Sequence, residues 1–591
     1  MKLKTLGESH YTVFMISKTR HIFILALIFI LTLCLRGFQL GEIPNGLNRD
    51  EAAIGYNAFS LLQTGRDEYG ASYPISFKSF GDWKLPAYIY ASILPVSSFG
   101  LNQFSVRSVS FIAGSLTVFL TYLIGKKIFY RSQKASLLAA FILAITPWHI
   151  HFSRIASEAN LAAFSVALGV VIYLYGSYSK IWLAVSSVIL SFSLFSYHGN
   201  HLFTPLLFLW LLFLLRRNMR KLLIFALPFS LLALYIYSGT LFSADRTKMT
   251  GLSYFADEYS VYEKTDLLRL DHTSDAFLAR LLHNKITYAA LRFVEGYFKS
   301  LSPEFLVIKG GDNRQHNIPN FGNLYLWEYP VLFAGFYFFF RRKLPWRLLI
   351  SFWLFTAILP AAITRDSPHS ARMFAVMPVL ALLSAAGLQL LTSHKSGRGY
   401  YPRQSLVITI IIAFNLLLYT DQYFLHFPVN SDKWWGDGYR QLVDTVELLK
   451  PEYREIVMDR PENSPYIYFL FYNATDPEYY RRKAVRFSQD REGFQHVAQL
   501  DKLKFKKLDW GNDLTIPDRL LVSYAESTPP NATSGAVRVD KKVLAELRSS
   551  SGSDYGLQER DVVVSQLVKT IYLRDGQPYF YLIKVTKQNE N

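Results

Sequence analysis

About eleven apolar segments, each long enough or nearly long enough to cross a membrane as a helix, occupy the chain between residues 21 and 421. The hydrocarbon core of a bilayer is about 30 Å thick, and a helix needs about 20 apolar residues to cross it. The segments lie at roughly 21–38, 107–125, 134–150, 160–178, 181–197, 201–215, 221–238, 324–340, 346–364, 371–391 and 404–421. The stretch 86–101 is shorter and contains two prolines, so we interpret it as a helix on the membrane surface. The sequence therefore predicts an integral membrane protein with an all-α bundle of about 11 transmembrane helices.

Positively charged residues gather in alternate connections between these segments. The clusters are Lys126, Lys127, Arg131 and Lys134; Lys180; Arg216, Arg217, Arg220 and Lys221; Arg341, Arg342, Lys343 and Arg347; and Lys395, Arg398 and Arg403. The positive-inside rule places these connections in the cytoplasm, together with the cationic residues 1–20. No small-residue cleavage site follows the segment 21–38, which we therefore expect to be a retained anchor. Much of the net charge of +18 thus belongs to cytoplasmic turns, and no nucleic-acid partner is expected.

The remaining connections are longer and rich in ionisable and aromatic residues, and we expect them outside the cytoplasm. The first is an outer loop at 39–106, and a second, at 239–323, is a candidate lid that covers a site and orders when lipid binds, or one that serves packing alone. From residue 425 to 591 the pattern changes to that of a soluble α/β domain, with candidate strands at 455–458, 466–472 and 579–585. An odd number of spans places this domain outside as well. The predicted transmembrane domain is then 21–424, in a cell membrane.

Two adjacent carboxylates, Asp50 and Glu51, stand in the first outer loop. The residues from Glu51 to Thr64 have apolar side chains at helical spacing, and Gly65 ends the pattern. This predicts a helix on the membrane surface with Asp50 at its amino end. Asp50 is either a catalytic base or the N-cap of that helix, since aspartate is a preferred capping residue.

Two cations of the outer side are candidate phosphate ligands. Lys84 follows Trp83 at the start of the stretch 86–101, where it either binds a lipid phosphate or anchors the chain at the interface. Arg107 lies at the outer end of the second span, against the positive-inside pattern. It either binds phosphate or simply extends its side chain from the span to the lipid headgroups.

Further polar residues lie at the outer ends of spans. Arg154 and Glu158 are four residues apart, so on a helix they share a face and either pair or line a polar cavity. His198 and His201 have a spacing that suits a metal, but no third ligand accompanies them. His369 and Arg372 share a face at the mouth of a span and form a cationic cluster with Arg365.

Several classes of site are excluded by the sequence. Cys34 is the single cysteine, so no intrachain disulfide and no cysteine metal site is possible. The chain contains no Gly-rich phosphate loop, no dinucleotide fingerprint and no Gly-x-Ser-x-Gly elbow, which disfavours an ATP-driven pump.

In the order of its motifs the chain resembles the GT-C membrane glycosyltransferases, in particular glycosyltransferase family 39 and its relatives, the protein O-mannosyltransferases and the lipid A aminoarabinose transferases. The resemblance covers about residues 20 to 420. It rests on Asp50-Glu51, Lys84-Leu85-Pro86 where relatives often have Lys-Pro-Pro, Val106-Arg107-Ser108, Pro147-Trp148-His149, Ser153-Arg154 with Glu158, and Pro368-His369-Ser370-Ala371-Arg372.

The resemblance implies a hexosyl or pentosyl transfer from a polyprenyl-phosphate-linked sugar to an extracytoplasmic acceptor, with inversion at the anomeric carbon. Asp50 would be the base, with Glu51 orienting the acceptor or a cation. The donor phosphate would be bound by Lys84, Arg107, His369 and Arg372. The sugar or acceptor pocket would contain Arg154, Glu158 and His198. The resemblance implies no essential cofactor, it leaves a divalent metal undecided, and we assign no metal ligand.

Two other functions fit part of this pattern. A transporter or flippase of a lipid-linked saccharide would also place ionisable groups in a helical bundle, although it should carry them near the bilayer midplane. A membrane scaffold with an outer binding domain would give Asp50, Lys84 and Arg372 no reason to converge. The sugar and the acceptor, whether protein, glycolipid or wall polymer, are not encoded in any motif of the sequence.

Overall fold

The computed structural model describes residues 2–80, 83–130, 132–242, 258–271, 276–392, 402–489, 494–538, 558 and 561–588. The chain forms two compact units. Unit 1 comprises Met1–Leu40, Leu85–Tyr88 and Arg107–Phe424, and unit 2 comprises Gly41–Lys84, Ile89–Val106 and Leu425–Asn591. Unit 2 therefore includes the segment around Asp50 as well as the carboxy-terminal part of the chain. The linear domain boundaries stay a prediction.

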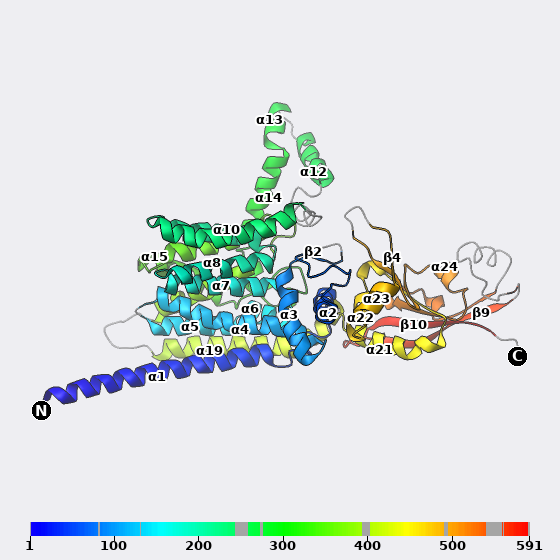
Figure 1. Cartoon of the computed structure of the whole chain (residues 1–591), viewed down its shortest axis with the longest axis horizontal. Coiled ribbons are helices and arrows are strands. Elements are labelled where there is room, and N and C mark those ends of the chain that lie inside the picture. Colours follow the sequence, from blue (N-terminus) through cyan, green and yellow to red (C-terminus); the bar gives the residue numbers. More distant parts are fainter. Residues whose placement is uncertain are drawn as a thin grey trace. The chain divides into compact units, whose positions relative to one another are not determined.

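Helices make up unit 1 (Figure 1). They are α1 (Lys2–Gly37), α4 (Gln103–Ile128), α5 (Gln133–Ile145), α6 (Pro147–Arg154), α7 (Glu158–Gly176), α8 (Lys180–Phe192), α9 (Asn200–Leu214), α10 (Met219–Phe242), α12 (Glu258–Leu270), α13 (Ala276–Leu282), α14 (Lys285–Lys299), α15 (Glu328–Arg341), α16 (Arg347–Ala357), α17 (Leu359–Ala362), α18 (Met377–Thr392) and α19 (Pro402–Asp421). In the packing, α5 contacts α1 and α18, α18 contacts α15, and α8 contacts both α7 and α10.

Glycines allow the closest of these helix contacts, between α15 and α18. A Cβ added to Gly335 would lie 1.9 Å from the carbonyl oxygen of Leu383, and one added to Gly387 would lie 2.1 Å from that of Val331. Any larger residue at either position would push the two helices apart. Small residues at helix interfaces are typical of membrane bundles, where close backbone packing replaces the hydrophobic effect.

Six described helical stretches are long and apolar enough to cross a membrane, at Thr19–Gly37, Gln103–Ile128, Glu158–Gly176, Met219–Ser238, Phe374–Thr392 and Gln404–Asn430. The pair α5 and α6, bent by 58°, makes a seventh if it is one span. Shorter apolar helices occur at Lys180–Phe195, Asn200–Leu214 and Arg347–Ala362. A multi-pass membrane protein is thus supported, while the count of about 11 spans is not confirmed.

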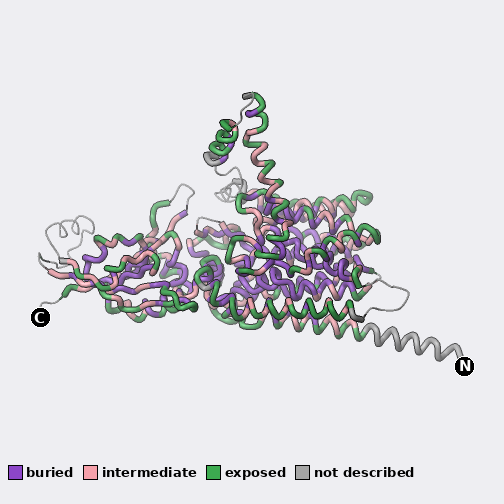
Figure 2. Tube along the Cα trace, turned by 180° about the vertical axis from the view of Figure 1, so that it is seen from behind, coloured by how far each residue is buried: buried purple, intermediate pink, exposed green. Residues whose placement is uncertain are grey.

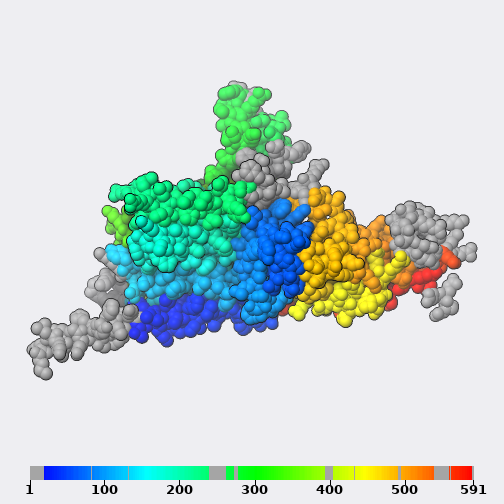
Figure 3. Space-filling model, in the orientation of Figure 1, coloured from blue at the N-terminus to red at the C-terminus, as the bar shows by residue number. Residues whose placement is uncertain are grey.

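Burial separates inner spans from outer ones (Figure 2). The helices α7 and α18 are mostly buried, whereas few residues are buried in the spans of α1, α10 and α19. On α10 the exposed leucines Leu223, Leu227, Leu231 and Leu234 repeat at helical spacing. Figure 3 shows residues of α8, α9 and α10, coloured teal to green, on part of the surface of unit 1, with α1 in dark blue on another part. In a membrane such an apolar face contacts lipid.

Unit 2 contains a mixed sheet of eight strands in the order β4-β5-β6-β3-β7-β10-β9-β8. The central strand β3 runs parallel to β6 and β7, and the other neighbours are antiparallel. The strands are β3 (Glu455–Met458), β4 (Ala484–Arg486), β5 (Val497–Leu500), β6 (Leu503–Phe505), β7 (Arg519–Tyr524), β8 (Ser534–Arg538), β9 (Val562–Tyr572) and β10 (Pro578–Lys587). A separate ribbon pairs β1 (Phe77–Lys78) with β2 (Trp83–Lys84). The strands predicted at 455–458 and 579–585 are confirmed.

The helices of unit 2 include α2, which contains the two adjacent acids. The set is α2 (Arg49–Thr64), most of α3 (Pro86–Phe99), α20 (Phe427–Asn430), α21 (Tyr439–Leu449), α22 (Tyr466–Tyr472), α23 (Pro477–Lys483) and α24 (Trp510–Asp513). The predicted helix ends as expected at Gly65, whose φ of 66° is left-handed. Its residues Ala52 to Ala58 are buried, and it packs on α22 and α23. Protein therefore covers most of the apolar face that we expected on a membrane surface.

One predicted strand is wrong. Residues Tyr466–Tyr472 form the helix α22, and six of these seven residues are buried. A short run that is apolar on every side has no period, so the pattern alone does not distinguish a buried strand from a buried helix.

A buried acid, Glu68, lies just beyond α2 in unit 2. Burial and the nearby Asp67 carboxylate raise the pKa of Glu68 from 4.5 to about 8, although the Arg486 charge acts in the opposite direction. The neutral form is therefore the one that the folded protein favours.

The stability that this neutral carboxyl contributes should be fully present below pH 4.5 and lost as the pH rises to about 8. Glu68→Gln has no proton to lose, so it should raise the midpoint of thermal unfolding at pH 8 relative to wild type, with little difference at pH 4.5. The effect should be on the order of a few kcal/mol. Thermal unfolding of the purified protein between pH 4.5 and 8.5 checks this, with the exposed Glu42→Gln as control. Equal pH dependence in all three proteins would contradict it.

Candidate active site

The first turn of α2 shows which residue caps this helix. The side chain of Asn48 accepts a hydrogen bond of 2.8 Å from the backbone N–H of Glu51. Asn48 is therefore the N-cap, and the capping alternative for Asp50 is wrong. The Glu51 side chain is buried, whereas that of Asp50 is about half exposed.

Asp50 forms an ion pair with Lys84, another residue predicted for the site. The Lys84 Nζ lies 3.0 Å from Asp50 Oδ1, and the exposed fractions of the two side chains are 6% and 51%. Lys84 is fixed on β2, opposite Phe77 of β1. The structure thus brings together, within unit 2, the predicted base and one predicted phosphate ligand. A lysine in this position has three N–H donors, so it can hold Asp50 and an anionic ligand at the same time.

His369 and Arg372 lie in unit 1, in the turn before α18. The Arg372 guanidinium donates to Thr364 Oγ1 at 2.7 Å and to the Asp366 carboxylate. His369 Nε2 lies 3.7 Å from Asp366 Oδ2, and its ring is 5.1 Å from that of His316. The predicted cationic cluster therefore contains an acid, Asp366, that sequence reasoning did not include. The neighbouring Arg365 is exposed.

The electrostatics of this cluster change the role expected for His369. Burial and the positive charge of Arg372 hold the pKa of His369 well below its ordinary value of 6.5. The imidazole is therefore neutral at pH 7 and offers hydrogen bonds rather than the positive charge that we predicted. Burial raises the pKa of Asp366, but the hydrogen bond and charge of Arg372 outweigh it and the pKa is lowered overall. Arg372 and Asp366 are therefore both charged, and an anion must compete with Asp366 for Arg372.

Asp366→Asn should strengthen the binding of polyprenyl phosphate, because Arg372 then has no carboxylate partner in this cluster. We expect the Kd to fall by about tenfold, the equivalent of about 1.4 kcal/mol. A titration of purified protein with polyprenyl phosphate measures the change. The control is Asp312→Asn, which removes an exposed acid of unit 1. An unchanged Kd in Asp366→Asn would argue against Arg372 as a phosphate ligand.

Three buried arginines of unit 1 bind backbone carbonyls at a helix end or in the turn that follows one. Arg154, at the end of α6, donates to Leu35 and Arg36 at 3.1 and 2.9 Å, in the last turn of α1. Arg36 in turn donates to Leu143 and Ala144 at 3.0 and 2.8 Å, in the last turn of α5. Arg107 donates to the carbonyl of Leu40 at 3.2 Å. Carbonyls in the last turn of a helix have no partner within it, and the negative end of the helix dipole favours a cation.

These contacts give Arg107 and Arg154 a structural role, and their roles in binding phosphate and sugar stay predictions. Arg154 also lies with its Cζ 5.0 Å from the ring centre of Phe424. The prediction that Glu158 shares a helix with Arg154 is wrong, since α6 ends at Arg154 and α7 begins at Glu158. His198 precedes α9, with its ring 5.3 Å from that of His201.

Sequence reasoning did not identify Arg36. One feature of the sequence could have indicated Arg36. It is an ionisable residue in the last turn of an apolar span, and such a residue is costly there unless it is paired. Arg36 also donates to His149 Nδ1 at 2.8 Å, and since arginine only donates, that nitrogen must be the acceptor.

Arg36→Met keeps the length of the side chain but leaves the carbonyls of Leu143 and Ala144 without these donors. Each buried unpaired group costs about 1–3 kcal/mol, so the thermal unfolding midpoint should fall clearly. Arg20→Met removes an exposed arginine of the same helix and should leave the midpoint nearly unchanged. Equal midpoints for the two variants would contradict a clamping role for Arg36.

The described residues contain no group of three or more His, Cys, Asp or Glu side chains placed to hold a metal ion. The need for a divalent metal stays untested.

Residues 81–245 match the model of the family described as dolichyl-phosphate-mannose-protein mannosyltransferase. The expected resemblance to GT-C transferases is confirmed over this segment, which supports the transferase class in general. The match includes Lys84, Arg107, Arg154, Glu158 and His198, and it does not extend to Asp50, Glu51, His369 or Arg372.

Among solved structures, the chain has distant similarity to ArnT and to AglB. ArnT from Cupriavidus metallidurans in the apo state is 11% identical with a TM-score of 0.49, and the alignment covers 96% of this chain and 98% of that one. The archaeal oligosaccharyltransferase AglB from Archaeoglobus fulgidus, in complex with an inhibitory peptide and a dolichol-phosphate, is 13% identical with a TM-score of 0.41. That alignment covers 77% of this chain and 64% of AglB. At TM-scores below 0.5 these likenesses are too distant to assign a function. No curated protein matches the chain.

Proposed function

We propose that this protein is an integral membrane glycosyltransferase that moves a sugar from a polyprenyl-phosphate donor to an extracytoplasmic acceptor, with inversion at the anomeric carbon. The family match over residues 81–245 supports the transferase class, and the apolar spans of unit 1 support a membrane protein. The donor class is the one named in the description of the matching family.

The observation that carries the proposal is the ion pair of Asp50 and Lys84. The two residues are far apart in the sequence, and each was assigned on separate grounds to one half of the same reaction. Asn48 supplies the cap of α2, so capping does not explain Asp50. The half-exposed carboxylate and the buried ammonium form one polar site within unit 2, where a base and a phosphate ligand are both needed.

The reaction assigns each of these groups one task. The Asp50 carboxylate takes the proton of the acceptor hydroxyl. At the same time the hydroxyl oxygen of the acceptor attacks the anomeric carbon from the face opposite the phosphate. The bond between the anomeric carbon and the phosphate oxygen breaks, and the electron pair leaves with the polyprenyl phosphate. The Lys84 ammonium stabilises the negative charge that builds on this leaving group. The proton stays on Asp50 until solvent removes it.

The proposal also includes the roles that the sequence predicts for other residues. Glu51 orients the acceptor or a cation, Arg372 adds positive charge for the donor phosphate, and neutral His369 adds a hydrogen bond. The loop 239–323 covers the bound lipid, and some of its residues lie outside the described part of the chain. The membrane is the cell membrane, with the amino terminus in the cytoplasm and the carboxy-terminal domain outside.

The test is transfer by purified protein given a panel of radiolabelled polyprenyl-phosphate sugars. Wild type should release or transfer one of these sugars, and Asp50→Asn should bind the lipid but lose at least about 99% of turnover, since general bases contribute about 10²–10⁴-fold. The matched control is Glu42→Gln, which removes an exposed carboxylate of the same unit.

Each outcome of this test has a defined meaning. Full turnover in Asp50→Asn would remove Asp50 from the mechanism. Lipid binding without turnover by the wild type, with candidate acceptors present, would favour the alternative of a transporter or flippase, which a flipping assay in proteoliposomes then measures.

A further inference from the structure

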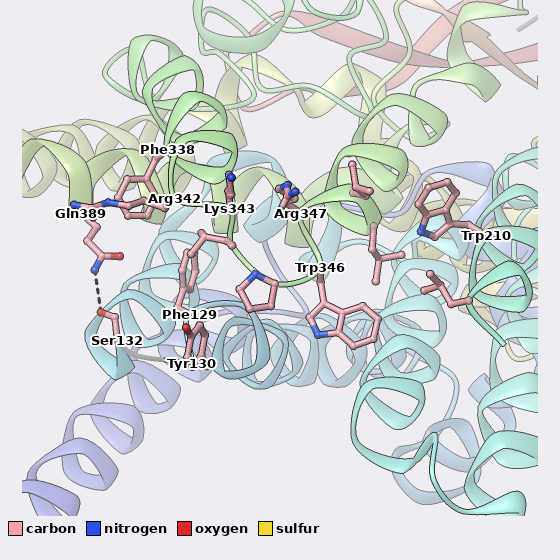
Figure 4. Close-up of a pocket in the computed structure, with 15 residues that line it drawn as sticks. Phe129, Tyr130, Ser132, Trp210, Phe338, Arg342, Lys343, Trp346, Arg347 and Gln389 are labelled. Atoms are coloured by element: carbon pink, nitrogen blue, oxygen red, sulfur yellow. Dashed lines mark hydrogen bonds between the residues drawn. The ribbon is translucent and has the colours of Figure 1, made fainter. Parts of the chain in front are cut away.

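Unit 1 carries a groove at the helix ends that the proposed reaction does not use (Figure 4). Its volume is about 660 Å³. The connection between α15 and α16 provides one wall, and the connection between α4 and α5 together with the ends of α9 and α18 provides the rest. This is the end of the bundle to which the positive-inside rule assigns the cytoplasm.

Three cations line the groove, Arg342, Lys343 and Arg347. Among the described residues, none of them has a carboxylate within ion-pair distance. The sequence explains why, because the stretches 83–157, 159–244, 329–365 and 367–420 contain no Asp or Glu at all. Every connection at this end of the bundle is therefore cationic without an internal counter-ion, and the groove attracts anions.

Apart from Ser132 and Gln389, which are hydrogen bonded to each other, the rest of the lining is apolar and aromatic. Figure 4 shows Trp346 on the same connection as Lys343 and Arg347, with Phe129 and Tyr130 on the other wall. The apolar side chains of Leu214 and Leu348 also line the groove and are exposed. Tryptophan and tyrosine at the end of a membrane span are typical of the headgroup region. The ligand should thus be amphiphilic.

A second hollow of about 710 Å³ adjoins the first, and Phe338 and Arg342 line both. It adds Arg341 and apolar residues of α15 and α18, including Tyr337 and Leu391. Arg342 is thus placed to bind a headgroup whose apolar part extends along the helices in either hollow.

From this geometry we propose that the groove binds the phosphate headgroup of an anionic glycerophospholipid of the cytoplasmic leaflet. The guanidinium groups of Arg342 and Arg347 and the ammonium of Lys343 bind the phosphate, and the aromatic wall covers the glycerol and the start of the acyl chains. This site is separate from the residues of the proposed reaction, so it stands whether or not the protein transfers sugar.

The experiment measures lipid binding to purified full-length protein in detergent by native mass spectrometry. The probes are phosphatidylglycerol, zwitterionic phosphatidylcholine with the same acyl chains, and polyprenyl phosphate, with water-soluble glycerol phosphate as a competitor. Wild type should bind phosphatidylglycerol at least about tenfold more tightly than phosphatidylcholine. The triple variant Arg342→Gln, Lys343→Gln, Arg347→Gln should lose this preference.

The matched control is Arg216→Gln, Arg217→Gln, Arg220→Gln, which removes the same charge from another connection at the same end of the bundle. It should keep the preference of the wild type. Where the groove triple does not survive purification, Arg342→Gln alone replaces it and should reduce the preference at least threefold.

Four results would overturn the proposal. An unchanged preference in the groove variant would remove the site, and an equal loss in the control would show a general effect of surface charge. Glycerol phosphate that competes as well as the lipid, or polyprenyl phosphate whose binding the groove variant weakens more than that of phosphatidylglycerol, would assign the groove to a different ligand.

Discussion

The reciprocal capping of helix ends by Arg36 and Arg154 is the constraint on which the polar end of unit 1 depends. Arg36, in the last turn of α1, donates to the last turn of α5, and Arg154, at the end of α6, donates back to the last turn of α1. Helix ends inside a membrane protein need partners for their carbonyls, because no bulk water supplies them. Two long donor-only side chains satisfy four carbonyls and fix three helices. The same need for carbonyl partners explains why arginines that the sequence predicts for the active site are buried and bound to the backbone.

Lys84 and Arg372, two cations predicted to bind the donor phosphate, each have a carboxylate beside them. Lys84 pairs with Asp50 in unit 2, and Arg372 pairs with Asp366 in unit 1. A cation left alone in a poorly solvated place is costly, and a nearby acid lowers that cost until an anionic ligand arrives. The acids of the two pairs act differently on a ligand. Both acids are about half exposed, but Asp50 is the proposed base for the acceptor, whereas Asp366 competes with any phosphate for the guanidinium of Arg372.

The sequence predicted the features that repeat along the chain. Every predicted span coincides with one or more helices, and the helix of Asp50 ends at Gly65, because hydrophobic periodicity and a left-handed glycine are local signals. The strand predicted at 466–472 failed since a fully buried run has no period. The expectation that Arg154 and Glu158 lie on one helix is wrong because α6 ends at Arg154 and α7 begins at Glu158. The partners of Lys84 and Arg36 were out of reach because they depend on packing between distant segments, whereas the partner of Arg372, Asp366, depends on how the turn before α18 folds.

The stereochemistry of the sugar linkage tests the central claim most directly. A donor of known anomeric configuration is given to the purified protein with an acceptor, and the linkage in the product is assigned by NMR coupling constants. Single displacement with Asp50 as base predicts the opposite configuration in the product. A product with the configuration of the donor would require a covalent sugar intermediate and would contradict the account.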